Sequence, residues 1–201
     1  MLPRSLSQAA QVSGARARRA KALQWPVQPV SPALRRWLKA PGSLTARLRA
    51  LGTVQVEVMS QGTRRLWPAE RRLLKQTSGH VREVILCLDG EPVVWARSIT
   101  SQRALKGPWK ALKGLGARPL AELLFSHARV RRGRLARHAW QRTGPEQARA
   151  RRDWHRVGQR LPSAQPSSAP GWARQSVFWH HGLPLRVMES FTPGMRARFT
   201  P

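Results

Sequence analysis

The stretch Leu185-Arg-Val-Met-Glu-Ser-Phe191 alternates apolar and polar residues as a β-strand does. Every second residue of a strand points to the same face, so Glu189 points the same way as Val187 and Phe191. Glu189 is also the only acid after Asp153, in a chain with 37 Lys and Arg but 9 Asp and Glu residues. An acid on an apolar face needs a reason, because burying an unpaired charge costs several kcal/mol.

A second predicted strand, Val81-Arg-Glu-Val-Ile-Leu-Cys-Leu88, has the same feature with the opposite sign. Here Arg82 shares a face with Val84. Asp89-Gly90 follows, and this dipeptide is a strong signal for a tight hairpin. In such a hairpin Arg97 on the return strand would reach the same side of the sheet as Arg82. Arg97 could then hold a second negative charge of a ligand, or it could be structural.

Two interpretations account for the inward charges Arg82 and Glu189. In the first, the two side chains form a structural ion pair that holds their strands in register. In the second, they line a binding cavity, where Arg82 takes a ligand carboxylate and Glu189 takes a ligand hydroxyl. Alternation alone favours neither.

The order of elements predicts an α+β fold with a single antiparallel sheet of about six strands, helices packed on one face and an enclosed ligand site. Helices are expected over residues 31–39, 44–51, 69–75, 109–115 and 120–125, and strands over 54–58, 81–88, 93–99, 174–181 and 185–192. Residues 127–141 are expected to form a hairpin that turns near Gly133. We expect a basic, disordered tail over 1–28 and one domain over 29–196. Within that domain, the Arg-, Ser- and Pro-rich segment 143–170 is predicted to be a surface insertion, disordered in its second half.

The net charge of +28 favours anionic partners, whether a nucleic acid, a membrane surface or a small polyanion. A single cysteine, Cys87, excludes an internal disulfide and fits the reducing cytoplasm, where we expect the protein to act as a monomer. No apolar run approaches the ~18 residues of a membrane helix. Residues 1–21 resemble a transit peptide in composition, but a basic tail in weak contact with anionic lipid is the expectation we prefer.

Motifs for other chemistries are missing from the sequence. The six His residues have no metal-ligand spacing, and Gly114-Leu-Gly116 is too short for a phosphate-binding fingerprint. The pairs Arg131-Arg132 and Arg151-Arg152 match no nucleic-acid-binding module, and a solvated basic surface explains them. A basic nucleic-acid-binding protein nevertheless remains the main alternative, and it predicts no cavity around Arg82 and Glu189. Nucleic acid is not the partner that we expect.

Four segments in order resemble the chorismate pyruvate-lyase family, and together they span roughly residues 30–193. They are Gly42-Ser-Leu-Thr-Ala-Arg-Leu48, Arg82-Glu-Val-Ile-Leu-Cys-Leu-Asp-Gly-Glu-Pro92 with Ala96-Arg97-Ser98, Leu115-Gly-Ala-Arg-Pro-Leu-Ala-Glu-Leu-Leu-Phe125, and Trp172-Ala-Arg174 with Pro184-Leu-Arg-Val-Met-Glu-Ser-Phe-Thr-Pro193. Two departures are the length of segment 143–170 and Ser101, where family members often have proline.

The resemblance implies a lyase that converts chorismate to 4-hydroxybenzoate and pyruvate, the first step of ubiquinone synthesis, with no metal or organic cofactor. It also implies a six-stranded antiparallel sheet with a closed internal site. By motif position, Arg82 corresponds to the family's carboxylate-binding arginine and Glu189 to its glutamate at the ring hydroxyl. Both are the expected catalytic residues, and Leu44 and Leu120 are expected to bind substrate through backbone N–H groups. A non-catalytic aromatic-acid-binding module on the same fold is a further alternative.

Overall fold

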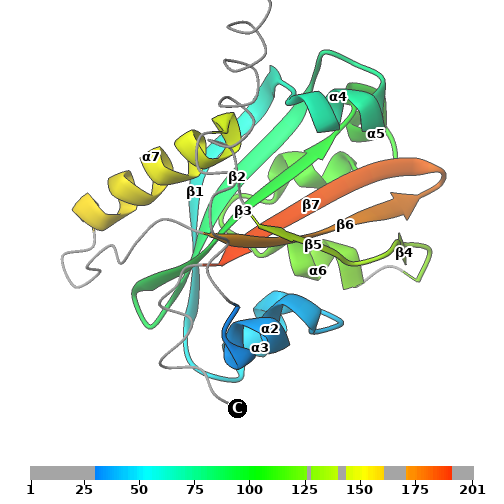
Figure 1. The fold of residues 1–201 in the computed structure, drawn as a ribbon. Helices are drawn as coiled ribbons and strands as arrows, with labels where there is room; N and C mark the ends of the chain where they lie inside the picture. Colours follow the sequence, from blue (N-terminus) through cyan, green and yellow to red (C-terminus); the bar gives the residue numbers. More distant parts are fainter. Residues whose placement is uncertain (1–29, 126–127, 140–143, 161–170, 192–201) are drawn as a thin grey trace, which may run out of the picture.

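The structure is a computed structural model that describes residues 30–125, 128–139, 144–160 and 171–191. Seven strands form one antiparallel sheet in the order β1-β2-β3-β7-β6-β4, and β5 also pairs with β6 (Figure 1). The strands are β1 (Val54–Arg65), β2 (Ser78–Leu88), β3 (Glu91–Thr100), β4 (Arg131–Arg132), β5 (Ala136–Ala139), β6 (Trp172–His180) and β7 (Leu183–Phe191). The predicted α+β class with a single antiparallel sheet is confirmed, with seven strands where about six were expected. The hairpin predicted near Gly133 is wrong, because β4 and β5 each pair with β6 and, in the described residues, not with each other.

Most of the helices cover one face of the sheet. They are α2 (Pro32–Lys39), α3 (Leu44–Arg49), α5 (Gln102–Lys106), the 3-10 helix η1 (Lys110–Gly114) and α6 (Leu120–Phe125). Ser31 and Ser43 cap α2 and α3, since each hydroxyl oxygen accepts a backbone N–H of the first turn. Apolar residues of these helices pack on Val84 and Leu86 at one end of this face, and on Leu185 and Val187 at the other.

The opposite face of the sheet is covered by α4 (Pro68–Leu74) and α7 (Pro145–Arg160). Residues 145–160 belong to the predicted surface insertion, but they form a helix that packs on Ile85, Trp95 and Met188. The sheet therefore carries helices on both faces, where helices on one face were expected. An apolar stripe anchors α7 among its arginines, formed by Ala150, Trp154 and Val157 at spacings of four and three. Residues 1–29 and 161–170 lie outside the described residues, so the expected tail and the second half of the insertion stay predictions.

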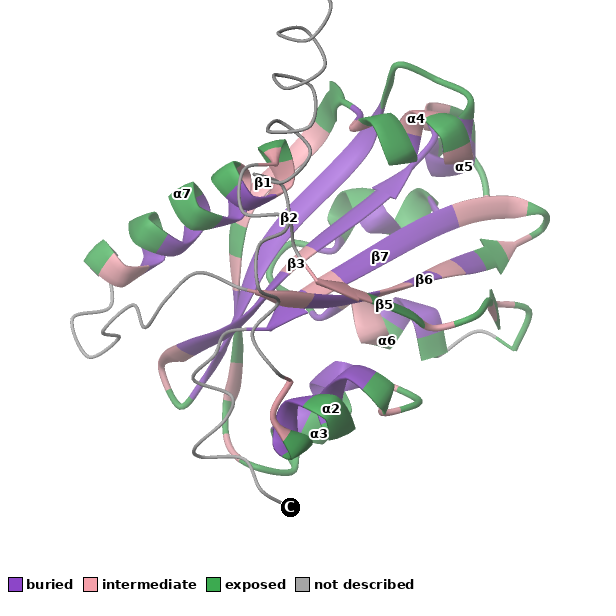
Figure 2. Cartoon of the chain, in the orientation of Figure 1, coloured by how far each residue is buried: buried purple, intermediate pink, exposed green. Residues whose placement is uncertain are grey.

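Coverage on both faces explains why the central strands are buried almost throughout (Figure 2). Every residue of β2 after Ser78 is buried, including Arg82 and Glu83. The continuous run Val-Ile-Leu-Cys-Leu in this strand is typical of a strand with two covered faces. Cys87 is part of this core, and burial raises the pKa of its thiol to about 12.

A β-bulge in the β2–β3 hairpin decides which side chains face the first set of helices. Cys87 lies opposite Pro92 but Leu86 lies opposite Val94, so β3 contains one extra residue. Beyond the bulge Arg82 therefore pairs with Ser98, whereas an unbulged hairpin would pair it with Arg97. A shift of one residue exchanges the two faces of a strand.

Arg97 consequently lies on the α7 side of the sheet, opposite Glu83 on β2. The prediction that Arg97 and Arg82 reach the same side is wrong, because nothing in the local residue pattern indicates the bulge.

Candidate active site

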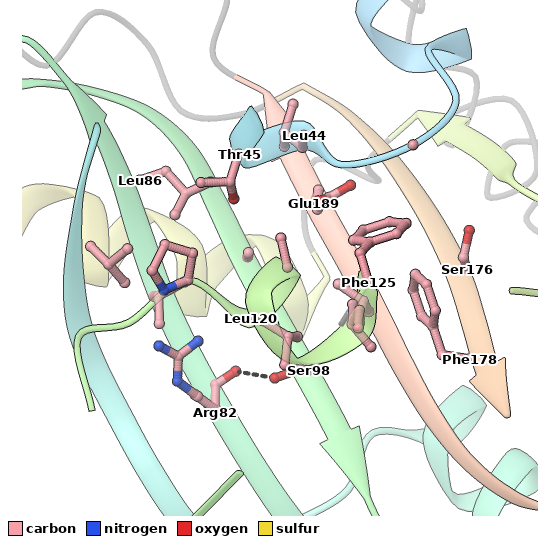
Figure 3. Close-up of a pocket in the computed structure, with 18 of the residues that line it drawn as sticks. Leu44, Thr45, Arg82, Leu86, Ser98, Leu120, Phe125, Ser176, Phe178 and Glu189 are labelled. Carbon is pink, nitrogen blue, oxygen red and sulfur yellow. Dashed lines mark hydrogen bonds between the residues drawn. The ribbon is translucent and has the colours of Figure 1, made fainter. Parts of the chain in front are cut away.

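A pocket lies between the sheet and the helices α3 and α6 (Figure 3). All four residues expected at the site line it: Arg82, Glu189, Leu44 and Leu120. The lining also includes polar residues that the sequence did not single out, namely Thr45, Ser98, Arg132 and Ser176. Apolar walls separate these groups, formed mainly by Val84, Leu86, Ala96, Leu124, Phe178 and Val187.

The floor of the pocket is built from two rows of residues that are paired across the sheet. The two rows are two residues apart along each strand, because only alternate residues face the pocket. One row contains Arg82, Ser98, Val187 and Ser176, and the next contains Val84, Ala96, Glu189 and Arg174. Arg82 and Glu189 are thus two strands and one row apart. With strands about 4.8 Å apart and a rise of about 3.4 Å per residue, their Cα atoms are separated by roughly 12 Å. Figure 3 shows Arg82 at one end of the pocket, with Glu189 and Ser176 away from it.

Arg82 is a buried cation whose contacts do not balance its charge. Its side chain is 2% exposed, and Nη2 donates to the carbonyl oxygens of Gly116 and Arg118 at 2.9 and 3.1 Å. Nε has no hydrogen-bond partner, and no acid among the described residues forms a salt bridge with it. Burial lowers the pKa of Arg82 to about 10. An anionic ligand would therefore stabilise this guanidinium.

Glu189 is held by a different arginine. Arg174 Nε donates to Glu189 Oε2 at 2.6 Å, so the hypothesis of a structural ion pair between Arg82 and Glu189 is wrong. The Glu189 side chain is 18% exposed, compared with 1% for Arg174. Oε1 makes no hydrogen bond within the described part of the chain, which leaves one carboxylate oxygen to accept from a ligand hydroxyl.

Arg174 is a buried residue beside the site to which the sequence pattern assigned no role. Its Nη1 donates to the carbonyl oxygens of Trp37 and Ala40 at the end of α2, each at 2.9 Å. The signal that could have found it is the one that found Arg82. It alternates on its strand with Ser176 and Phe178, so it also points toward the pocket side of the sheet.

Leu44 and Leu120 are the first residues of α3 and α6, and both side chains line the pocket. The first N–H groups of a helix have no acceptor within that helix. This position is compatible with the expected backbone contacts to a ligand, which stay a prediction. Phe125, at the other end of α6, is 50% exposed and lies edge-on to Phe178, with ring centroids 6.3 Å apart. The pocket is therefore nearer to solvent at the Phe125 end than at the deeply buried Arg82.

Arg97 has a structural environment on the far face of the sheet. It forms salt bridges with Glu70 at 2.7 Å and Glu83 at 2.6 Å, and its guanidinium lies 3.6 Å from the ring centroid of Trp67. Arg97 does not line the pocket, so its interpretation as a second ligand-binding arginine is wrong.

Within the ranges that the structure describes, no cluster of three or more His, Cys, Asp or Glu residues is placed to hold a metal ion. No helix in those ranges is long and apolar enough to span a membrane.

Comparisons with known proteins identify the family of the chain. The chorismate lyase family profile matches residues 17–198. The chain is 44% identical over 167 residues to a probable chorismate pyruvate-lyase of Azoarcus sp., covering 81% of this chain and 85% of that protein. It is 40% identical over 176 residues to a probable chorismate pyruvate-lyase of Aromatoleum aromaticum, covering 85% and 91%. The chain belongs to the chorismate lyase family.

Among solved structures, the fold is similar to that of PhnF from Mycobacterium smegmatis, with a TM-score of 0.50 and 12% identity over 81% of this chain and 67% of that one. At this identity the likeness concerns the fold alone.

Proposed function

We propose that this chain removes pyruvate from chorismate and leaves 4-hydroxybenzoate, the reaction that opens ubiquinone synthesis. The observation that carries the proposal is the pairing of two groups across one apolar pocket. Arg82 is buried without an acid partner at one end, and Glu189 offers a carboxylate oxygen at the other. An aromatic acid with a hydroxyl opposite its carboxylate matches this arrangement.

The reaction needs little covalent assistance from the protein. The C–O bond between the ring and the enolpyruvyl oxygen breaks, and the ring carbon that bears the hydroxyl loses its hydrogen as a proton. The electron pair of that C–H bond completes the aromatic ring. The departing enolpyruvate gains a proton and becomes pyruvate. Because aromatisation drives the step, the protein mainly has to hold the reactive conformer and support the developing negative charge.

Arg82 anchors the ring carboxylate in this proposal. Its guanidinium already uses one nitrogen on two backbone carbonyls, and the unpartnered Nε is available for a carboxylate oxygen. A charge-assisted hydrogen bond in a buried site contributes about 1.5–3 kcal/mol to binding. Catalysis then follows from position, since the anchored carboxylate fixes the ring along the axis of the pocket.

Glu189 accepts the hydrogen bond of the ring hydroxyl through Oε1, while Arg174 keeps Oε2 in place. This contact orients the carbon that loses its proton, and the carboxylate is the nearest acceptor for proton movement. The apolar walls between the two charged ends keep water from the ring and strengthen both contacts. Backbone N–H groups of Leu44 and Leu120 add donors for substrate oxygens.

A direct assay tests the proposal against both alternatives. Purified chain is incubated with chorismate and a chelator, without added cofactor, and 4-hydroxybenzoate and pyruvate are measured. The proposal expects equal amounts of the two products. Binding of 4-hydroxybenzoate without turnover would favour the aromatic-acid-binding module. Salt-sensitive binding of DNA or RNA with no affinity for 4-hydroxybenzoate would favour the nucleic-acid alternative, which predicted no cavity around Arg82 and Glu189.

The remaining expectations extend the proposal to the whole chain. The protein acts as a cytoplasmic monomer, and its basic N-terminal residues 1–28 touch anionic lipid weakly and are not needed for turnover. Domain 29–196, expressed alone, should keep the kcat of the full chain. Sedimentation with anionic and neutral vesicles tests the lipid contact, and sedimentation velocity tests the monomer. A dimer, or equal binding to both vesicle types, would contradict these expectations.

A further inference from the structure

A second arginine lines the pocket and has no role in the account so far. Arg132 lies on the short edge strand β4, and it forms no salt bridge with any acid in the described ranges. Its neighbour Arg131 is exposed, whereas Arg132 is half-buried. From the sequence, both residues were expected to belong to a solvated basic surface. For Arg132 that interpretation is wrong, because the residue lines the pocket.

The guanidinium of Arg132 is held in a defined position. Nε donates to Ser176 Oγ at 3.0 Å, and Nη1 donates to the carbonyl oxygen of Gly42 at 3.0 Å. Nη2 makes no hydrogen bond with the described residues. Burial, together with the positive charge of Arg174, lowers the pKa of Arg132, and the negative charge of Glu189 only partly opposes this shift. Like Arg82, this group is a partly desolvated cation that a ligand anion would stabilise.

Arg132 belongs to the Glu189 end of the pocket. Ser176, which orients it, is on β6, one strand and one row from Glu189 on β7. Arg82 is in the same row as Ser176 but three strands away, which corresponds to roughly 14 Å between Cα atoms. The pocket therefore has one cation beside each end.

The substrate requires a second anion site at this place. Chorismate carries its enolpyruvyl ether on the ring carbon next to the one that bears the hydroxyl, and the side chain ends in a carboxylate. If the ring carboxylate is at Arg82 and the hydroxyl at Glu189, the second carboxylate lies beside Glu189 and off the ring axis. The two arginines then balance the two carboxylates of the substrate.

We propose that Arg132, oriented by Ser176, forms a second carboxylate subsite that binds the enolpyruvyl carboxylate. The inference rests on the proposed function. Arg132 is also placed to support the negative charge that develops on the leaving enolpyruvate as the C–O bond breaks. The product 4-hydroxybenzoate has lost this carboxylate, so Arg132 discriminates substrate from product, while Arg82 binds both.

Two stable aromatic probes isolate the subsite without any turnover. 3-(Carboxymethoxy)-4-hydroxybenzoate carries a second carboxylate on an ether oxygen beside the hydroxyl, and 3-methoxy-4-hydroxybenzoate carries the same ether without it. Calorimetric titration of the wild-type protein should show that the dicarboxylate binds about 10- to 100-fold more tightly than the methoxy compound. Arg132→Ala should abolish this ratio and leave the affinity for 4-hydroxybenzoate within about threefold.

Matched variants separate the subsite from general effects. Arg131→Ala removes the adjacent exposed charge of the same strand and should keep the ratio. Arg132→Lys should keep part of it, since the charge stays but the two-pronged contact is lost. A wild-type ratio near one, a ratio that survives Arg132→Ala, or equal losses for both probes and 4-hydroxybenzoate would overturn the inference.

Kinetics distinguish failure of the subsite from failure of the proposed function. With chorismate, Arg132→Ala should lower kcat/KM about 10- to 100-fold while Arg131→Ala changes it little. A wild-type protein that shows the probe ratio but does not turn over chorismate would contradict the proposed function and leave the subsite standing. Normal turnover in both variants would overturn the subsite and leave the function standing.

Discussion

Arg174 and Glu189 lie directly opposite each other on β6 and β7, with Arg174 Nε 2.6 Å from Glu189 Oε2. The same guanidinium holds the carbonyl oxygens at the end of α2. The position of the candidate catalytic carboxylate is therefore set by a helix that contributes no side chain to the pocket lining. In the proposed reaction, Arg174 is therefore a positioning residue, and Glu189 is the residue that would meet the ligand.

Replacing Arg174 with Gln should affect both stability and turnover. Removal of one partner of a buried ion pair costs about 3–5 kcal/mol, because the remaining charge loses its compensation. We expect urea unfolding to show a loss near the lower limit, since Glu189 is partly exposed, and kcat for chorismate to fall about tenfold or more. The double variant Arg174→Gln/Glu189→Gln should recover most of the stability but none of the activity. Full recovery of kcat in the double variant would contradict the positioning role.

Replacing Glu189 with Gln tests whether the carboxylate does more than position the ring. The amide has the same shape, and its oxygen can still accept from Arg174, so the variant should fold and bind 4-hydroxybenzoate. We expect kcat to fall by about 10²-fold or more, the usual contribution of a positioned acid–base group. Steady-state kinetics with chorismate provide the measurement. Turnover close to that of the wild type would remove any role in proton transfer.

Replacing Arg97 with Met should show that the two faces of the sheet have different roles, one in stability and the other in ligand binding. Arg97 is 4% exposed and forms salt bridges with both Glu70 and Glu83. Its loss leaves these buried carboxylates with one arginine each, Arg186 at 3.4 Å and Arg149 at 2.7 Å, so the free energy of unfolding should fall by about 3 kcal/mol, the lower limit for breaking a buried pair. The affinity for 4-hydroxybenzoate should stay within about threefold, because the pocket lies on the other face. Arg72→Met, on the exposed side of α4, is the control and should change stability by less than about 0.5 kcal/mol. A weakened ligand affinity in a folded Arg97→Met protein would contradict the assignment of faces.

Alternation of apolar and polar residues was sufficient to place Arg82 and Glu189 on an inward face, and the structure brings both to one pocket. It failed for Arg97 because a single extra residue in β3 reverses the face of everything beyond it. Bulges of this kind depend on tertiary contacts and leave no mark in the local pattern. The register of a hairpin predicted from its turn is therefore reliable only as far as the first irregularity.

The packing of α7 and the burial of Arg132 could not be predicted, because both lie in arginine-rich segments. The apolar stripe of α7 consists of three residues among many charges, so composition indicated a solvated insertion. Arg132 lies in a two-residue strand that is too short to show alternation. Its hydrogen-bond partners, Ser176 and Gly42, are 44 and 90 residues away in the chain. Contacts over such distances are not visible in a local sequence pattern.

His80, a buried residue of β2, should make stability depend on pH in the mildly acidic range. Burial lowers the pKa of His80, and the charges of Arg82 and Lys113 act in the same direction. The unfolded chain protonates this histidine near its ordinary pKa of about 6.5, while the folded chain protonates it only at lower pH. The unfolded state then binds more protons, so stability falls as pH decreases below about 6.5. Denaturant unfolding of the wild type and His80→Gln at about pH 7.5 and about pH 5.5 isolates the effect. The wild type should lose up to about 1.4 kcal/mol more than the variant between these values, and equal losses would contradict the assignment.

The most direct test of the account measures what Arg82 recognises. Titration calorimetry compares 4-hydroxybenzoate with 4-hydroxybenzamide, which has the same shape without the charge. The wild-type protein should prefer the acid by about 10- to 100-fold. Arg82→Gln should lose that preference, while Arg97→Gln, if folded, should keep it. A preference for the acid that persists in Arg82→Gln would show that the carboxylate binds elsewhere and would contradict the central claim.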